Sequence, residues 1–126
     1  LDHIKQKKLS DVLLESDIIS IHLPLNDDTE NIINAQAFEH LKKSVVIVNT
    51  ARGGIVQEQD MTKFLLSHPD SFAAFDVFND EPVQDKTLFN LDNFFGTSHR
   101  SSLTHEGINA MGMAAITGLD DNMEIT

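Results

Sequence analysis

The stretch that decides the fold is VVIVNTARGG, residues 45–54. Residues 45–48 form a continuous apolar run, whereas a strand with one solvent-exposed face alternates apolar and polar residues. Continuous runs are typical of strands that are buried on both faces in a parallel sheet. The polar segment 49–52 follows, and Gly53-Gly54 ends the strand.

Outward from this stretch, the sequence alternates between strand and helix patterns. Three more strands are predicted, at residues 18–23, 72–75 and 94–97. Helices are predicted at residues 10–15, 35–41, 57–66 and 104–116, with Ser10 and Asn34 as N-caps of the first two. Short connections between alternating strands and helices predict an α/β fold with a parallel sheet. We expect one domain over residues 1–118, an irregular segment at 78–92 and a polar tail at 119–126.

The composition excludes several classes of function. The 126 residues carry a net charge of −11, which disfavours unspecific binding to nucleic acid or to anionic membranes. The absence of cysteine excludes disulfides and thiolate chemistry and is compatible with a reducing compartment, so we expect a cytoplasmic protein. No apolar run reaches the length of a membrane span, and no histidines and carboxylates cluster at metal-ligand spacing.

Polar residues follow every predicted strand, and in open parallel sheets ligands bind beyond the carboxyl ends of the strands. Arg52, Glu81 and His99 follow the second, third and fourth strands. The guanidinium of Arg52 suits a carboxylate, and the glycines after it allow close approach of a ligand. Each residue also has an ordinary interpretation: a surface ion pair for Arg52, a solvated loop carboxylate for Glu81, and a backbone-bonded histidine for His99.

Together these three residues predict acid–base chemistry on a 2-oxo or 2-hydroxy acid. A carboxylate beside an imidazole orients the ring and favours its protonated form, so Glu81 would prepare His99 to exchange a proton with an alcohol or ketone oxygen. Arg52 would hold the substrate carboxylate and polarise the adjacent carbonyl. Sequence spacing alone does not show that the three residues meet.

Four phrases of the sequence resemble the D-2-hydroxyacid dehydrogenases. They are SDIISIHLPL at 16–25, VNTARGGIV at 48–56, DVFNDEP at 76–82 and TSH at 97–99. The resemblance extends from about residue 9 to residue 116. It implies the second half of a Rossmann-type, doubly wound parallel sheet, in other words a truncated NAD-binding domain.

The resemblance also implies roles for individual residues. Arg52 would bind the substrate, His99 would be the general acid in reduction and the base in oxidation, and Glu81 would orient His99. The coenzyme-binding residues would be Leu23, Thr50, Ala51, Arg52, Asp76, His99 and Ser102, with Asp76 binding the nicotinamide amide.

This chain departs from the family pattern near the predicted histidine. Ser98 replaces the usual proline before it, and Arg100-Ser101-Ser102 replaces the usual small apolar residues after it. The G-x-G-x-x-G turn that seats the coenzyme pyrophosphate does not occur in these residues. We therefore expect a fragment that lacks half of the coenzyme site and the substrate domain, and that is inactive alone. An open sheet edge would favour its association with other chains.

Several alternatives remain open from the sequence. The coenzyme is expected to be NAD, and NADP is not excluded. The substrate is a small 2-hydroxy or 2-oxo acid: phosphoglycerate, glycerate or hydroxypyruvate, and lactate are all candidates, with phosphoglycerate or hydroxypyruvate slightly favoured. The full-length protein is expected to be a homodimer with no nucleic-acid or membrane partner. A non-enzymatic, NAD-binding corepressor-like scaffold and an inactive remnant are the competing functions.

Overall fold

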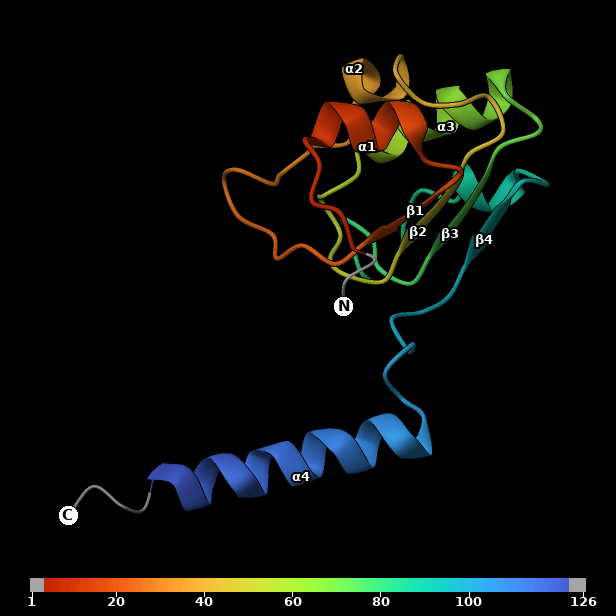
Figure 1. Ribbon diagram of the computed structural model, residues 1–126. Helices are drawn as coiled ribbons and strands as arrows, with labels where there is room; N and C mark the ends of the chain where they lie inside the picture. Colours follow the sequence, from red (N-terminus) through yellow and green to blue (C-terminus); the bar gives the residue numbers. More distant parts are fainter. Residues whose placement is uncertain (1–3, 123–126) are drawn as a thin grey trace.

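The computed structural model describes residues 4–122 and contains a parallel sheet, three helices beside it and one projecting helix (Figure 1). The strands are β1 (Ile18–Ile21), β2 (Val46–Asn49), β3 (Phe72–Phe75) and β4 (Phe94–Gly96). The helices are α1 (Leu9–Glu15), α2 (Ala35–Phe38), α3 (Glu58–Ser67) and α4 (His105–Asn122), with a 3-10 turn η1 at Leu88–Asn90.

The described strands lie side by side in the order β1-β2-β3-β4, and every neighbouring pair is parallel. Ile47 of β2 pairs with Ile19 of β1 and with Ala73 of β3, so β2 lies in the interior of the sheet. The predicted α/β fold with a parallel sheet is therefore confirmed. All four strands end at the same edge, where the polar segments of the sequence emerge.

The element bounds differ from the predictions mainly at their ends. The predicted bounds of β3 are the observed ones, β2 is displaced by one residue, and β1 ends at Ile21 instead of residue 23. Asn34 caps α2 as predicted, because its side chain accepts hydrogen bonds from the N–H groups of Gln36 and Ala37. The prediction for Ser10 is wrong, since α1 begins at Leu9 and its N-cap, Lys8, makes no side-chain cap bond.

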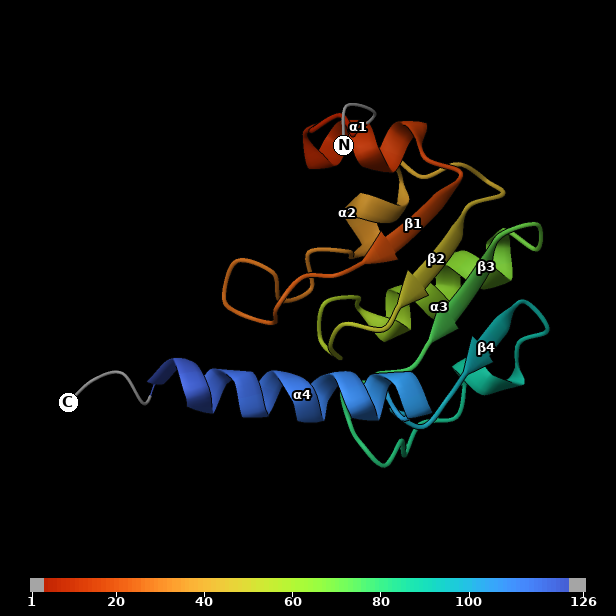
Figure 2. The same cartoon turned by 60° about the horizontal axis from the view of Figure 1, so that its bottom comes forward.

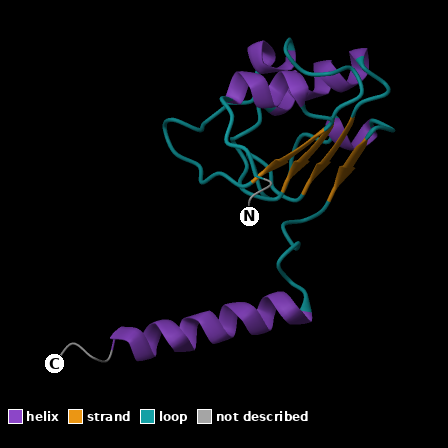
Figure 3. Ribbon diagram, viewed as in Figure 1, coloured by secondary structure: helices purple, strands orange, loops and turns teal. Residues whose placement is uncertain are grey.

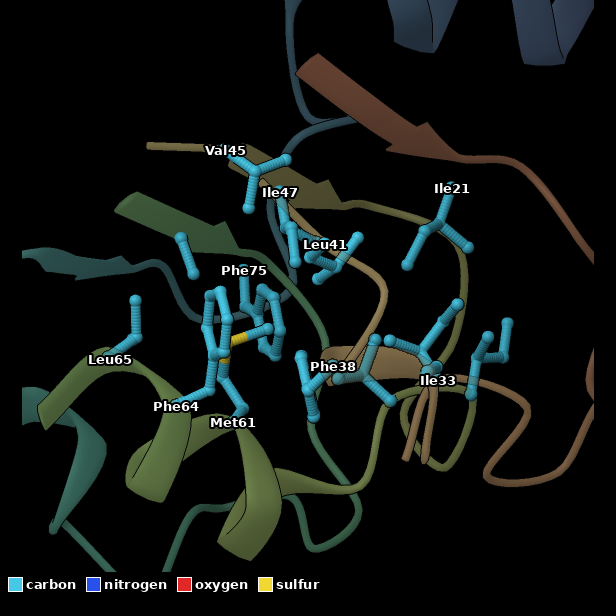
Figure 4. Packing of buried hydrophobic residues seen from close by; sticks show 14 of the residues in the cluster. Ile21, Ile33, Phe38, Leu41, Val45, Ile47, Met61, Phe64, Leu65 and Phe75 are labelled. Atoms are coloured by element: carbon cyan, nitrogen blue, oxygen red, sulfur yellow. The ribbon is translucent and has the colours of Figure 1, made fainter. Parts of the chain in front are cut away.

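Helices α1, α2 and α3 cover one face of the sheet (Figures 1 and 3). The side chains of Ile47 and Phe75 point from the sheet into this layer, where Phe38 and Phe64 stack at 5.0 Å between ring centroids (Figure 4). On β2 the burial alternates between full and partial, so the predicted burial of this strand on both faces is wrong for the described residues. The apolar residues of β2 lie on both faces of the strand, whereas the three helices cover only one face.

Helix α4 projects away from the sheet and from the other helices (Figure 2). It continues to Asn122, beyond the predicted end at residue 116, so residues 119–122 of the predicted polar tail are helical. Residues 123–126 lie outside the described part of the chain. Among the described helices, none is long and apolar enough to cross a membrane.

Gly53 joins the loops that follow β2 and β3. A Cβ atom at this position would lie 1.9 Å from the carbonyl oxygen of Phe78 and 2.7 Å from the backbone nitrogen of Asn79. Approach to a ligand was the predicted reason for this glycine, but the close neighbour is the chain's own backbone. Gly53 thus lets the loop that carries Arg52 lie directly against the loop that carries Glu81.

We expect the substitution Gly53→Ala to lower the free energy of unfolding by about 1–3 kcal/mol, because the new methyl group meets backbone atoms that have no rotamer to adopt. Gly112→Ala is the control for a methyl group that meets no neighbour, since nothing lies within 4 Å of a Cβ atom there, and alanine in the interior of α4 should not lower stability. Urea unfolding followed by circular dichroism measures both variants. Equal stability of the two variants would show that the loops separate at little cost.

Candidate active site

The structure brings Glu81 and His99 into contact beyond the ends of β3 and β4. The imidazole Nδ1 of His99 lies 2.8 Å from Oε2 of Glu81. The other carboxylate oxygen, Oε1, accepts a hydrogen bond of 3.0 Å from the backbone N–H of Phe78. The hydrogen bond to His99, followed by that from Phe78, holds the pKa of Glu81 below its usual value. The predicted contact between Glu81 and His99 is therefore present, and it fixes the direction of the imidazole ring; their catalytic roles stay a prediction.

The backbone of His99 is fixed by its neighbours. Its φ angle is +50°, in the left-handed region, and its N–H donates to the carbonyl oxygen of Asp76 at 2.8 Å. Because Glu81 fixes Nδ1, the second ring nitrogen, Nε2, is the one left to exchange a proton. The His99 side chain is half exposed.

The carboxylate of Asp76 is buried and organises the loop after β4. Oδ1 accepts hydrogen bonds from the hydroxyl of Thr97 and, at 2.8 Å, from the N–H of Arg100, while Oδ2 accepts from the N–H of Ser101 at 2.8 Å. Burial alone would raise the pKa of Asp76, but the hydrogen bonds from Thr97, Ser101 and Arg100 outweigh it and hold the pKa far below its usual value. Asp76 is therefore an ionised anchor beneath residues 97–101.

A buried asparagine performs the same task at the end of β2. Asn49 is 1 % exposed, its Oδ1 accepts the N–H of Ala51 at 3.1 Å, and its Nδ2 donates to the carbonyl oxygen of Arg52 at 3.0 Å. These bonds hold the loop that presents Arg52. The exposed guanidinium donates to the carbonyl oxygen of Ala51 at 2.6 Å and, among the described residues, forms no ion pair with a carboxylate. The structure thus gives no support to the interpretation of Arg52 as half of a surface ion pair.

Six of the eight predicted site residues line two hollows, and Asp76 and Ser102 line neither of them. The first is lined by Glu81, His99 and Arg100 over an apolar wall that includes Phe78 and Phe89. The second is lined by Leu23, Thr50, Ala51 and Arg52, together with His22, Pro24 and Leu25. Arg52 and His99 therefore line different hollows, whose loops touch where Gly53 meets Phe78. Ser102 is exposed and follows the segment that Asp76 anchors.

Sequence reasoning missed the roles of Asn49 and Thr97. Both lie inside the four quoted phrases, but nothing in a single sequence tells a buried hydrogen-bonding side chain from a solvated one. Their position at the ends of apolar parallel strands could have indicated these roles, because a polar residue that is buried there needs hydrogen-bond partners inside the protein. Both residues satisfy that need through the loops that carry the candidate catalytic groups.

Comparisons with known proteins identify the family of the chain. The family model for the D-isomer specific 2-hydroxyacid dehydrogenase NAD binding domain matches residues 2–101. The chain belongs to this family. Its sheet is the corresponding part of a Rossmann-type NAD-binding domain, as the sequence predicted.

Three similar proteins illustrate the family. D-3-phosphoglycerate dehydrogenase of Methanocaldococcus jannaschii is 36 % identical over 104 residues, which are 82 % of this chain and 20 % of the relative. The structure of a glyoxylate reductase from Paecilomyes thermophila has a TM-score of 0.87 and 30 % identity, covering 98 % of this chain and 38 % of that one. D-lactate dehydrogenase with NAD+ from Lactobacillus jensenii has a TM-score of 0.76 and 29 % identity, covering 83 % and 36 % of the two chains. The 126 residues thus span between a fifth and two fifths of these relatives.

The contact between His99 and Glu81 can be tested by titration. We expect His99→Asn to raise the pKa of Glu81 toward its usual value, because the largest cause of its lowering is removed. Asparagine tolerates the left-handed backbone conformation of His99, so the loop should keep its course. Carboxyl-detected NMR measures the titration, with His40→Asn, at an exposed site, as the control. An unchanged Glu81 titration in His99→Asn would show that the two side chains do not interact in solution.

The anchoring role of Asp76 predicts a specific pH dependence of stability. Because the folded-state pKa of Asp76 is lowered, its ionised form stabilises the fold above the unfolded-state pKa of about 3.9, and this contribution is lost as the pH falls toward the folded-state pKa. We expect Asp76→Asn to cost about 1–3 kcal/mol at neutral pH, and the gap to wild type to narrow below about pH 4. Urea unfolding at several pH values measures this, and a gap that does not change with pH would contradict the role.

Proposed function

We propose that this chain carries the proton-transfer and carboxylate-binding groups of an NAD-dependent D-2-hydroxyacid dehydrogenase. The observation that carries the proposal is the 2.8 Å contact between His99 and Glu81 at the carboxyl edge of the sheet, next to the loop of Arg52. A histidine held by an ionised carboxylate is suited to exchange a proton with the oxygen of a substrate. Arg52, which pairs with no carboxylate in the part of the chain that the structure describes, is suited to bind the carboxylate of that substrate.

In the direction of reduction, Arg52 would bind the carboxylate of the 2-oxo acid and polarise the carbonyl group beside it. His99 would donate the proton on Nε2 to the carbonyl oxygen, while Glu81 stabilises the imidazolium through Nδ1. In the direction of oxidation, neutral His99 would accept the proton of the 2-hydroxyl group. When bound, a nicotinamide coenzyme would supply the hydride for reduction and would accept it in oxidation.

The hollow of Leu23, Thr50, Ala51 and Arg52 fits the nicotinamide half of the coenzyme, because it offers an apolar wall and backbone groups at the edge where sheets of this type bind ligands. His99 and Ser102 would lie beside the nicotinamide. Asp76, which is buried beneath residues 97–101, would act on the nicotinamide amide through the loop that it anchors. A G-x-G-x-x-G seat for the pyrophosphate does not occur in the 126 residues. Our choice of NAD over NADP rests only on the family, whose model describes an NAD binding domain.

The substrate is a small 2-hydroxy or 2-oxo acid. The named relatives act on phosphoglycerate, glyoxylate and lactate, so the family alone does not select one substrate. We further propose that the whole protein is a homodimer with a cytoplasmic location. The net charge of −11 also favours the absence of a nucleic-acid or membrane partner. The isolated chain is expected to bind the acid without turning it over.

Binding of a 2-oxo acid by the purified chain tests this proposal. We expect pyruvate to shift the NMR signals of the Arg52 guanidinium and the His99 imidazole, without steady oxidation of added NADH. Arg52→Gln should weaken binding at least tenfold, which is roughly the loss of one charge-assisted hydrogen-bonded pair. Lys43→Gln is the matched control, because it removes one exposed positive charge before β2, at the opposite edge of the sheet.

Two outcomes would contradict the proposal. Equal binding by wild type and Arg52→Gln would show that the carboxylate site lies elsewhere. Steady turnover by the chain, with contaminating dehydrogenase excluded, would show that the reaction does not need a G-x-G-x-x-G pyrophosphate seat. It would also show that the 126 residues contain a complete active site.

A further inference from the structure

The sequence contains only two arginines, and both follow strands at the same edge of the sheet. Arg52 follows β2 and Arg100 follows β4, whereas the other positive charges of the chain are lysines. Among the described residues, neither arginine forms an ion pair, although the chain has 20 acidic residues. On so acidic a protein, two unpaired guanidinium groups at one edge indicate that their partners are anions from outside the chain.

The backbone of Arg100 is held in place beside the candidate catalytic histidine. Its N–H donates to Oδ1 of Asp76 at 2.8 Å, and its carbonyl oxygen accepts the N–H of Leu103 at 2.9 Å. Asp76 is 3 % exposed, so this attachment is made to the interior of the protein. The side chain of Arg100 therefore starts from a fixed point next to His99, which a residue on a loosely held loop would not do.

Arg100 lines the same hollow as Glu81 and His99, and these three are the only charged or titratable residues among those that line it. Both oxygens of Glu81 are engaged, one by His99 and the other by the N–H of Phe78. When His99 is protonated, the Glu81–His99 pair is neutral and Arg100 supplies the net charge of the hollow. Phe78, Val83 and Phe89 form an apolar wall that strengthens the attraction of Arg100 for an anion.

We propose that Arg100 binds a second anionic group of the substrate, so that the preferred acids carry a carboxylate, phosphate or sulfonate at the end opposite the 2-oxo acid group. This inference rests on the proposed function, since it assumes that Arg52 and His99 bind the reacting end. We assign the anion to the substrate rather than to the coenzyme, because Arg100 shares its hollow with Glu81 and His99, the pair proposed to exchange the proton with the substrate. Arg100 would thus determine specificity without taking part in the proton transfer.

A pair of acids of equal length isolates the second charge. We expect the chain to bind 2-oxopentanedioate about tenfold more tightly than 2-oxopentanoate, which has the same carbon skeleton without the second carboxylate. Arg100→Gln should abolish this preference and leave the affinity for 2-oxopentanoate unchanged. Arg100→Lys should retain part of it, because the charge is kept and the bidentate fork is lost. Lys43→Gln, which removes a charge from the opposite edge, should keep the full preference. NMR titration measures all four chains.

Three results would overturn the inference while leaving the proposed function intact. The first is equal affinity of wild type for the two acids, and the second is a preference that persists in Arg100→Gln. The third is weaker binding of nicotinamide mononucleotide by Arg100→Gln, which would assign Arg100 to the coenzyme phosphate. If neither acid binds and Arg52→Gln does not weaken the binding of pyruvate, the proposed function fails together with the inference. This outcome is distinct from the other three.

Discussion

The buried carboxylate of Asp76 is the constraint on which the candidate site depends. An ionised group in the interior must be fully hydrogen-bonded, and here its partners are the hydroxyl of Thr97 and the N–H groups of Arg100 and Ser101. The chain that leaves β4 is therefore forced back over the end of β3. His99 lies inside this segment, and its own N–H is bound by the backbone of Asp76. Held in this segment, its imidazole lies 2.8 Å from the carboxylate of Glu81.

Asn49 has the same anchoring function at the end of the neighbouring strand. The residues that hold the loops of the site are therefore different from the residues that would contact a ligand. Asn49 and Asp76 are buried at the ends of adjacent strands, and each binds the loop that carries an exposed functional residue. The N–H of Asp76 also donates to the carbonyl oxygen of Asn49 at 2.9 Å, so the two strand ends are joined directly. The side chains of Arg52 and His99 are thus exposed while hydrogen bonds to buried residues hold their backbones.

The sequence predicted the features that depend on local pattern, and it failed where tertiary contacts decide. The parallel sheet, the bounds of β3 and the cap at Asn34 follow from apolar runs and capping chemistry. The meeting of Glu81 and His99 was predicted from chemistry together with the family resemblance, because no spacing rule joins residues 18 positions apart. The role of Gly53 was misjudged, since the nearest backbone is that of Phe78, which is distant in sequence. The apolar run of β2 indicated two covered faces, whereas the described helices cover one. The pattern records how apolar a strand is and not which elements cover it.

An anionic ligand would be repelled by the whole protein at long range and attracted by the two arginines at short range. The net charge of −11 repels any anionic ligand at long range, and repels one with two charges more strongly. At physiological ionic strength this repulsion is screened beyond about 8 Å, whereas contacts inside a hollow are screened much less. Arg52 and Arg100 therefore need not change the overall field of the protein in order to bind an anion. Each needs only to lack a carboxylate partner of its own and to be held where the ligand arrives. The hydrogen bonds of Asn49 and Asp76 supply that second condition, so the proposed anion binding depends on these two buried polar residues as well as on the arginines.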